Sequence, residues 1–300
     1  MAGFRSIAEY VAADELGRCH VSQFRKVVAS AATPTSGWVD YSYFAGLPTA
    51  NFYASAPLVA AVLEQSKGIY IPNVSPLKQF IKSFTVMSGA ASATTTTSQR
   101  QALMLCDYLM YYPFIDSDAI GEEQIMENQI TIPRYGSGLV MAVAQSAAST
   151  VGRFTMTYTN QAGTPGRVSQ NTFTISSLSG GGQIASTGAS GAGFHPFVAL
   201  QLGDTGVRSI ESVTFSAPGG GLMALVIVKP ILRHVVTQAC RRTTSSNLES
   251  YGSADEVLSI IHRQQMNQIM DGAVLNFMAQ GFAGSLASSQ LVGLLETVWA

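Results

Sequence analysis

Apolar side chains recur at every second position in one clear stretch of the chain. From Phe154 to Tyr158 they alternate with threonines, which is the period of a β-strand that buries one face. The next residues, QAGTPG, contain the glycines and the proline that a tight turn needs, and a second apolar series begins at Val168. We therefore predict a β-hairpin over residues 153–176.

More strands are predicted on both sides of this hairpin. Residues 128–146 fit two strands around a Gly-Ser-Gly turn, and residues 197–203 and 209–217 fit one strand each. Residues 221–232 contain an unbroken apolar run, which is typical of a strand that is covered on both faces. Strands separated by turn signals about every 8–12 residues favour a sandwich or a jelly roll.

Helical spacing of the apolar residues dominates the first third of the chain. Residues 4–29 fit a helix with a break near Gly17, and residues 56–68 and 74–89 fit two shorter helices. Residues 91–113 open with a threonine tract and continue as an apolar segment that ends at a proline. This apolar run is too short for its period to decide between a buried helix and a strand.

The C-terminal part is predicted to be helical as well. In residues 253–280, Ser253 and Glu256 have the spacing of a capping box, and an apolar stripe follows them. Residues 285–300 continue as a second apolar helix. Such helices either fold back over the same subunit or dock on a partner.

The chain is therefore expected to have an α+β fold. Its centre would be an antiparallel β-sandwich, similar to a jelly roll, flanked by N-terminal helices with an extended arm and by C-terminal helices. The corresponding domains are residues 1–127 for the helices and the arm, 128–232 for the sandwich, and 233–300 for the C-terminal helical segment.

The composition favours a subunit of an assembly over a free monomer with a highly charged surface. Only 12% of the 300 residues are charged and the net charge is −1, whereas soluble domains average about 25% charged residues. A surface of small neutral residues packs readily against other proteins. The near-neutral charge argues against direct binding of nucleic acid, and no apolar run approaches the length of a membrane span. The three cysteines are too far apart to indicate zinc or a disulfide frame.

Two segments are candidates for contacts between subunits. Residues 32–57 are rich in proline, glycine and aromatic residues and have no period, so they fit either a loop over their own core or an arm that reaches a neighbour. Residues 177–193 are rich in glycine and carry no charge, and we expect a contact loop there instead of a phosphate cradle or a linker. The candidate interface residues are aromatic: Trp38, Tyr41, Tyr43, Phe44, Phe52, Tyr53 and Trp299.

We find no catalytic constellation, and we expect neither an enzyme nor a cofactor. The four histidines stand apart from one another, and no nucleophile motif is complete. One acidic cluster could bind Ca²⁺, although the full spacing of a calcium loop is absent and the prediction stays open. Its members are Asp116, Asp118, Glu122, Glu123 and Glu127.

Three strings resemble a family of virion structural proteins of tailed bacteriophages. They are LCDYLMYYPFIDSDAIGEEQIMENQITIPRYGSG, FTMTYTNQAGTPGRVSQN and GWVDYSYFAGLPTANFYASAPLVAAVLE. The resemblance covers roughly residues 30–230 and implies an abundant, non-enzymatic assembly protein that is made in the host cytoplasm and resides in the virion.

Within such a virion we expect a capsid decoration or cement protein. It would form homo-oligomers and contact other virion proteins, the major capsid protein above all. The alternatives are a virion-surface module that reads a carbohydrate or a receptor, and another shell, collar or tail subunit.

Overall fold

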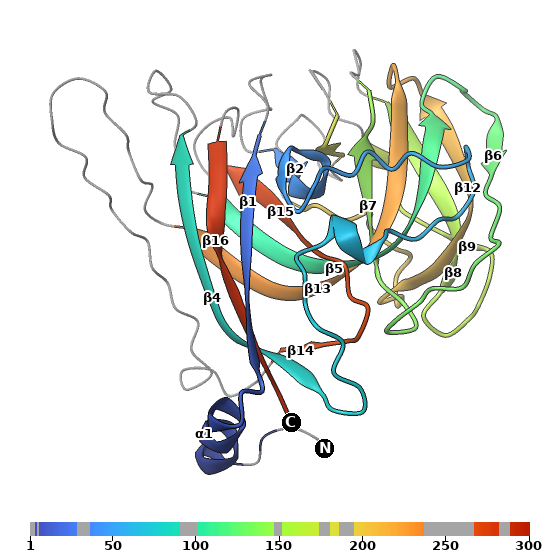
Figure 1. Ribbon diagram of the computed structural model, residues 1–300. Helices are drawn as coiled ribbons and strands as arrows, with labels where there is room; N and C mark the ends of the chain where they lie inside the picture. Colours follow the sequence, from blue (N-terminus) through green and yellow to red (C-terminus); the bar gives the residue numbers. More distant parts are fainter. Residues whose placement is uncertain are drawn as a thin grey trace, which may run out of the picture.

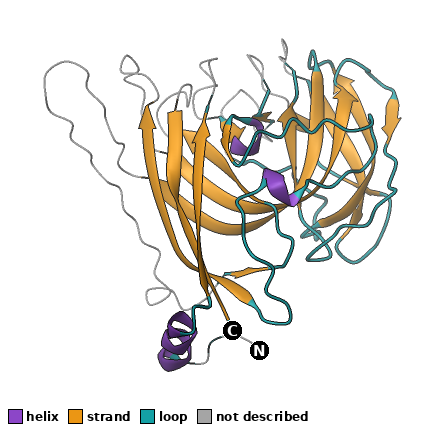
Figure 2. Cartoon of the chain, viewed as in Figure 1, coloured by secondary structure: helices purple, strands orange, loops and turns teal. Residues whose placement is uncertain are grey.

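The computed structural model describes residues 4, 6–28, 37–90, 101–146, 152–173, 181–185, 195–236, 267–281 and 289–300. These residues form a closed six-stranded barrel and two further sheets, and almost all regular structure in them is β (Figures 1 and 2). The single α-helix is α1 (Ile7–Glu15), and two short 3-10 helices are η1 (Tyr41–Tyr43) and η2 (Gln65–Lys67).

The barrel is closed by six strands that come from distant parts of the sequence. In spatial order they are β11 (Gln183–Ile184), β2 (Trp38–Asp40), β15 (Leu275–Gly281), β5 (Gln101–Asp116), β13 (Leu222–Val236) and β7 (Leu139–Ala144). The barrel thus takes strands from all three of the ranges into which we divided the chain.

Two sheets pack against the outside of the barrel. The terminal sheet has the order β14 (Gln268–Ile269), β4 (Gln79–Ala90), β16 (Ser289–Trp299), β1 (Cys19–Val27) and β3 (Gly46–Leu47). The hairpin sheet has the order β10 (Thr172–Phe173), β8 (Arg153–Asn160), β12 (Val207–Ala217) and β6 (Glu123–Ile125), with β9 (Arg167–Val168) also paired to β8. In Figure 1 the long strands of the terminal sheet lie on the left and the hairpin sheet lies on the right.

Strand β5 serves both outer sheets, and a bulge separates the part that faces one sheet from the part that faces the other. Leu105 packs toward the terminal sheet, while its neighbour Met104 points into the barrel. Register then shifts, since Tyr108 pairs with Val228 but Met110 pairs with Ile227, which leaves one residue of β5 unpaired as a bulge. Beyond it, Met110 packs toward the hairpin sheet. An unbroken apolar run is the expected sequence of such a strand, because both of its faces are covered.

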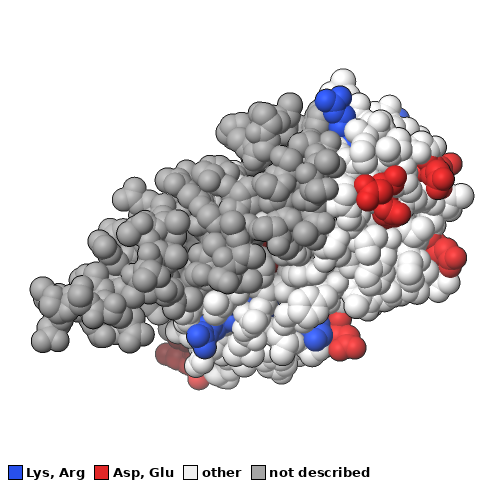
Figure 3. All heavy atoms as spheres, turned by 90° about the horizontal axis from the view of Figure 1, so that it is seen from above, with Lys and Arg blue, Asp and Glu red and all other residues white. Residues whose placement is uncertain are grey.

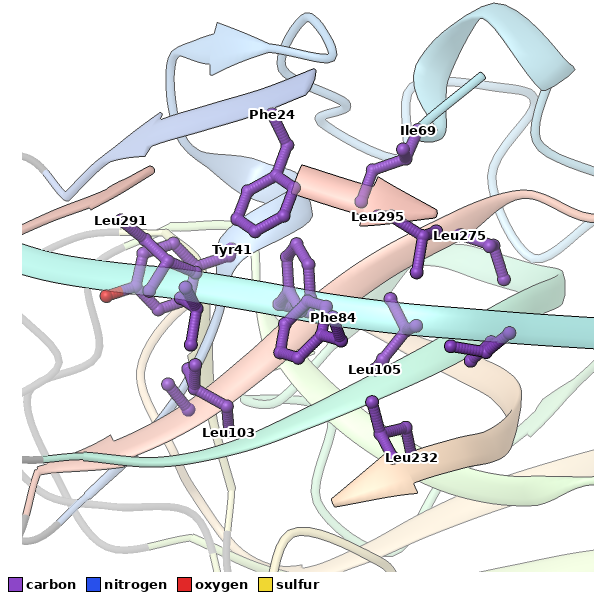
Figure 4. Close-up of a cluster of buried hydrophobic side chains, with 14 of the residues drawn as sticks. Phe24, Tyr41, Ile69, Phe84, Leu103, Leu105, Leu232, Leu275, Leu291 and Leu295 are labelled. Atoms are coloured by element: carbon purple, nitrogen blue, oxygen red, sulfur yellow. The ribbon is translucent and has the colours of Figure 1, made fainter. Parts of the chain in front are cut away.

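The core between the terminal sheet and the barrel is built on aromatic rings (Figure 4). Phe24 of β1 stacks on Phe84 of β4 with centroids 5.8 Å apart, and its ring lies 4.7 Å from that of Phe277 of β15. Leucines from β5, β13 and β16 fill the space around these rings. Burial of this surface favours folding by about 25 cal/mol per Å² of apolar area.

The prediction of an α+β sandwich flanked by helices is wrong, because the described ends of the chain are mostly strands. Within residues 4–29, α1 confirms the first part, but residues 19–27 form β1. Residues 79–90 form β4, and the described parts of the two predicted C-terminal helices form β14, β15 and β16. In β16 the buried positions alternate from Ser289 to Leu295, as a strand requires.

A glycine explains why this alternation was invisible in the sequence. Gly293 occupies a buried position of β16, and a Cβ atom there would collide with the backbone oxygen of Thr85 and with the ring of Phe24. The apolar residues that remain around it, such as Leu291 and Leu294, then have helical spacing. Glycine inside a strand marks a close approach of this kind.

The strand predictions in the middle of the chain were more accurate than the helix predictions. The hairpin is confirmed by the pairing of β8 with β9 and β10, and β12 and β13 lie where strands were predicted. Residues 101–116 form the strand β5, which settles the ambiguity there. Residues 128–138 and 197–203 are irregular, however, and the predicted helix at 56–68 contains only the short η2.

Candidate functional site

The predicted interface aromatics lie mostly inside the chain itself. Trp38, Tyr41, Phe44 and Tyr53 are buried, because the arm supplies barrel strand β2 and the segment that follows it. Tyr43 and Trp299 are half-buried, and Phe52 is the exposed member, at 56%. Their assignment to a subunit interface stays a prediction, for which Phe52 is the ring available on the surface.

The interior of the barrel contains a buried carboxylate. Tyr108 donates a hydrogen bond to Oδ1 of Asp40 at 2.7 Å, and the hydroxyl of Ser42 donates to Oδ2 at 2.7 Å. The backbone N–H of Ser42 also donates to Oδ1 at 2.9 Å, and the Tyr53 hydroxyl donates to Oδ2. Burial raises the pKa of Asp40, and these donors oppose the rise. Because the group is closed off and fully bonded, it holds η1 and β5 together instead of offering a reactive acid.

Lys26 is a second buried charged group, on the inward face of β1. It is fully buried, and its Nζ donates to the backbone oxygen of Phe44 at 3.2 Å. Burial lowers the pKa of Lys26 to about 8, although the charge of Asp40 opposes the shift. This amine loses its proton far more readily than an exposed lysine does.

A third buried group ties the barrel to the irregular segment 128–138. Arg134 donates two hydrogen bonds of 2.7 Å to Asp107 of β5, and the backbone N–H of Val274 donates a third at 2.9 Å. Burial raises the pKa of Asp107, and the paired guanidinium opposes the rise. The bidentate geometry makes this a positioning contact for the segment.

The acidic cluster at 116–127 is engaged by the protein itself. Asp116 accepts the backbone N–H of Asp118, Asp118 accepts that of Gly220, and Glu123 accepts the hydroxyl of Ser212 at 2.6 Å. Within the described ranges, no group of three or more histidine, cysteine, aspartate or glutamate side chains is arranged to hold a metal ion. Calcium binding at this cluster stays a prediction.

The described cysteines are poor nucleophiles. Cys106 is buried in the barrel, and burial raises the pKa of its thiol well above the usual value. Burial and a hydrogen bond of 2.9 Å to Asp14 raise the pKa of the Cys19 thiol to about 11. Since the thiolate is the reactive form, neither group is poised for catalysis.

A groove of about 590 Å³ runs along β1, and sequence reasoning did not find it. Four consecutive β1 residues, from His20 to Gln23, line one wall, and residues 47–49, 65, 66 and 68–70 line the others. The His20 ring meets the ring of Tyr70 edge to face at 5.4 Å. The Ser22 hydroxyl donates to the backbone oxygen of Tyr70, so it is not paired with His20 as a nucleophile would be. The signal in the sequence was the alternation of CHVSQFRKV, which helical spacing masked.

The outer face of the terminal sheet is the second feature that the sequence did not predict. Val21 is 51% exposed on it and Leu294 38%. Its charged outward positions are Arg25, Lys82 and Glu296, and the neutral ones include Val21, Gln23, Ser83, Thr85, Met87, Val292 and Leu294. The view in Figure 3 shows the same scarcity of charge, with Lys, Arg, Asp and Glu scattered over a largely uncharged described surface.

The glycine-rich segment is only partly described. Residues 181–185 contain β11 and line the barrel between β2 and β7, where Gly181 lies against the ring of Tyr43. The other residues of 177–193 lie outside the described ranges, so the expected contact loop stays a prediction.

The only α-helix among the described residues has nine residues and cannot cross a membrane. Comparison with known proteins returned no similarity: no family model, no curated protein and no solved structure matches this chain.

Proposed function

We propose that this chain is a non-enzymatic structural subunit of a bacteriophage virion, a capsid decoration or cement protein that associates with its own copies and with other virion proteins. The observation that supports the proposal most is the outer face of the terminal sheet. It presents the exposed apolar side chains of Val21, Met87 and Leu294, and helix α1 packs on it at the end formed by Phe80 and Val298. Apolar patches of this kind on a protein surface mark contacts with other proteins.

Helix α1 extends the same argument. Tyr10 and Ala13 pack on Phe80 and Val298 of the terminal sheet, while Ile7 and Val11 point away from it and are 69% and 46% exposed. Their spacing of four residues puts both apolar side chains on one outward face of the helix. A helix with apolar side chains on both faces is suited to lie between two proteins.

The polar groups of the interior support a structural role as well. Asp40, Asp107 and Lys26 are each buried and held by neighbouring protein groups. A catalytic site needs such groups to converge on an accessible cleft. The groove along β1 has no charged side chain in its lining.

The decisive experiment combines sedimentation of the purified chain with mass spectrometry of the particles. We expect the wild type to sediment as an oligomer and to occur in purified particles of the phage that encodes it. Leu294→Glu should dissociate the oligomer without changing the melting temperature, because the side chain is on the surface. Leu202→Glu, at a fully exposed turn by the hairpin sheet, is the matched control and should behave as the wild type. A monomeric wild type that is absent from the particles would refute the proposal.

A further inference from the structure

The backbone of β1 is paired on one side only along most of its length. All nine residues pair with β16, but β3 covers the other edge only at Arg25 and Lys26. Residues 19–24 of β1 thus form an open edge, although β1 is the second strand of its sheet in spatial order.

The hydrogen-bond pattern identifies the groups on this open edge. In an antiparallel ladder, alternate residues bond to opposite sides. The backbone N–H of Val28 donates to Ser289 of β16, so the even-numbered residues of β1 bond to β16. The N–H of Val27 donates to Ala45 at 3.0 Å, on the β3 side. The N–H and C=O groups of Val21 and Gln23 therefore point to the open edge, where no described residue bonds to them.

The groove lies directly along these groups. Alternate side chains of a strand point to opposite faces, so a cavity that touches four consecutive residues must lie at the edge of the strand. The opposite wall is firmly attached to the barrel, since the N–H of Ile69 donates to Leu275 of β15 at 2.8 Å. The site is thus formed before any partner arrives.

Nothing at this edge discourages pairing with another strand. Proteins protect open edges with lysine, proline or a bulge. Residues 19–24 contain none of these, and the pairing of β1 with β16 is regular throughout. The groove lining contains no lysine, arginine, aspartate or glutamate. An uncharged peptide segment is the chemistry that suits it, and this chain is itself only 12% charged.

We infer that the open edge of β1 accepts an extended, uncharged segment from a second copy of this chain, which adds a strand to the terminal sheet. Backbone groups of Val21 and Gln23 would bond to the incoming backbone, and the groove would hold its alternate side chains. The inference rests on the proposed self-association and names the site at which one subunit receives another.

Amide hydrogen exchange of the wild type, measured residue by residue by NMR at low and high concentration, tests the inference directly. We expect the amides of Val21 and Gln23 to exchange fast in the dilute protein and to be protected in the oligomer. The amides of Ser22 and Phe24 bond to β16 and are the internal reference, protected in both states. Equal exchange of Val21 and Gln23 in both states would overturn the inference, and so would a wild type that never associates.

Proline variants test the same groups by a second route. Val21→Pro and Gln23→Pro each remove one N–H that has no bond within the described chain, and proline is tolerated at such edge positions. We expect dissociation constants at least about tenfold weaker, with the melting temperature little changed. The matched controls Val21→Thr and Gln23→Thr change the side chain but keep the N–H, and should associate as the wild type.

The outcomes separate this inference from the proposed function. If Leu294→Glu dissociates the oligomer but the proline variants do not, the outer face is used and the open edge is not. If the proline variants dissociate it while the chain is absent from particles, the edge site stands and the virion role fails. If Val21 and Gln23 become protected only after other virion proteins are added, the second copy is the wrong occupant.

Discussion

The terminal sheet and the hairpin sheet pack on the same barrel, yet their outer surfaces differ in polarity and in hydrogen bonding. On the hairpin sheet the outward positions of β8 are threonines, and the loop groups are bonded by charged residues. Asp204 accepts hydrogen bonds of 2.7–2.9 Å from Tyr158, Asn160 and Arg167. On the terminal sheet the outward positions include the exposed apolar side chains of Val21, Met87 and Leu294, and one edge of β1 is open along residues 19–24. The outer surface of the hairpin sheet is therefore suited to contact with water, whereas that of the terminal sheet is suited to contact with another protein.

The largest expected effect comes from filling the tight approach inside the terminal sheet. Gly293→Val places side-chain atoms against the Thr85 backbone and the Phe24 ring, and should destabilise the protein by about 3 kcal/mol. Urea unfolding measures the loss. The control Val292→Ala, at the next and outward position, should cost less than about 1 kcal/mol. Equal effects would mean that this sheet is not packed as described.

A smaller loss is expected when the charged contacts of the hairpin sheet are removed. Asp204→Ala leaves the Tyr158 hydroxyl and the Arg167 guanidinium without their acceptor, and should lower the melting temperature at pH 7. Arg167 holds the pKa of Asp204 below its usual value. The stabilisation is therefore present above the pKa of an unfolded aspartate and lost as pH falls through the folded pKa. Melting curves from pH 7 to pH 2 should converge for wild type and variant; a constant gap would argue against the ion pair.

The terminal sheet should respond to pH in the same direction but in a higher pH range. Unfolded Lys26 keeps its proton up to about pH 10.5, whereas the folded protein releases it at about pH 8. Between these values the unfolded state binds more protons, so the free energy of unfolding rises with pH, by about 1–3 kcal/mol from this group. The measurement is the difference between wild type and Lys26→Met across pH 7–10.5, because tyrosines titrate near the upper end. A difference in unfolding free energy that does not change with pH would mean that the Lys26 amine is exposed to water.

The smallest effect on stability is expected from exchanging the two outer surfaces. Thr157→Leu on the hairpin sheet and Leu294→Thr on the terminal sheet should each change the unfolding free energy by less than about 0.5 kcal/mol. Their effects on association should differ. Sedimentation should show that Leu294→Thr self-associates more weakly than the wild type, whereas Thr157→Leu self-associates as the wild type does. Two variants that sediment alike would remove the distinction between the two sides.

Sequence patterns located the strands whose two faces meet different environments. The hairpin at β8 alternates because one face is buried and the other is wet, and the run in β13 is unbroken because both faces are covered. The patterns failed where a small residue interrupts the alternation, as Gly293 does in β16, and where a charged side chain is buried, as Lys26 is in β1. Both positions are decided by contacts with residues far away in the sequence, Thr85 and Phe44 among them, which local spacing does not contain.

The candidate site was harder to predict than the fold. Residues 32–57 fitted either a loop over their own core or an arm that reaches a neighbour, and the rings of Trp38, Tyr41, Phe44 and Tyr53 lie in the interior because this segment supplies barrel strand β2. The open edge of β1 arises because its backbone groups have no partner strand there. The pairing of β1 with β16 and β3 is needed to identify these groups, and the sequence of β1 does not contain that information.

The continuity of β5 and β13 has a mechanical consequence. Because β5 and β13 run through both halves of the molecule, a load applied to the terminal sheet is carried along two continuous strands to the hairpin sheet. Neither half can detach alone, since doing so would turn the shared strands out of the other half. The molecule should therefore unfold in one step under heat or force. Deleting Leu109 removes a buried leucine and the bulge, while Tyr108 still faces the barrel interior and Met110 still faces the hairpin sheet, so the deletion should destabilise the protein by about 2–5 kcal/mol without reversing the faces of β5.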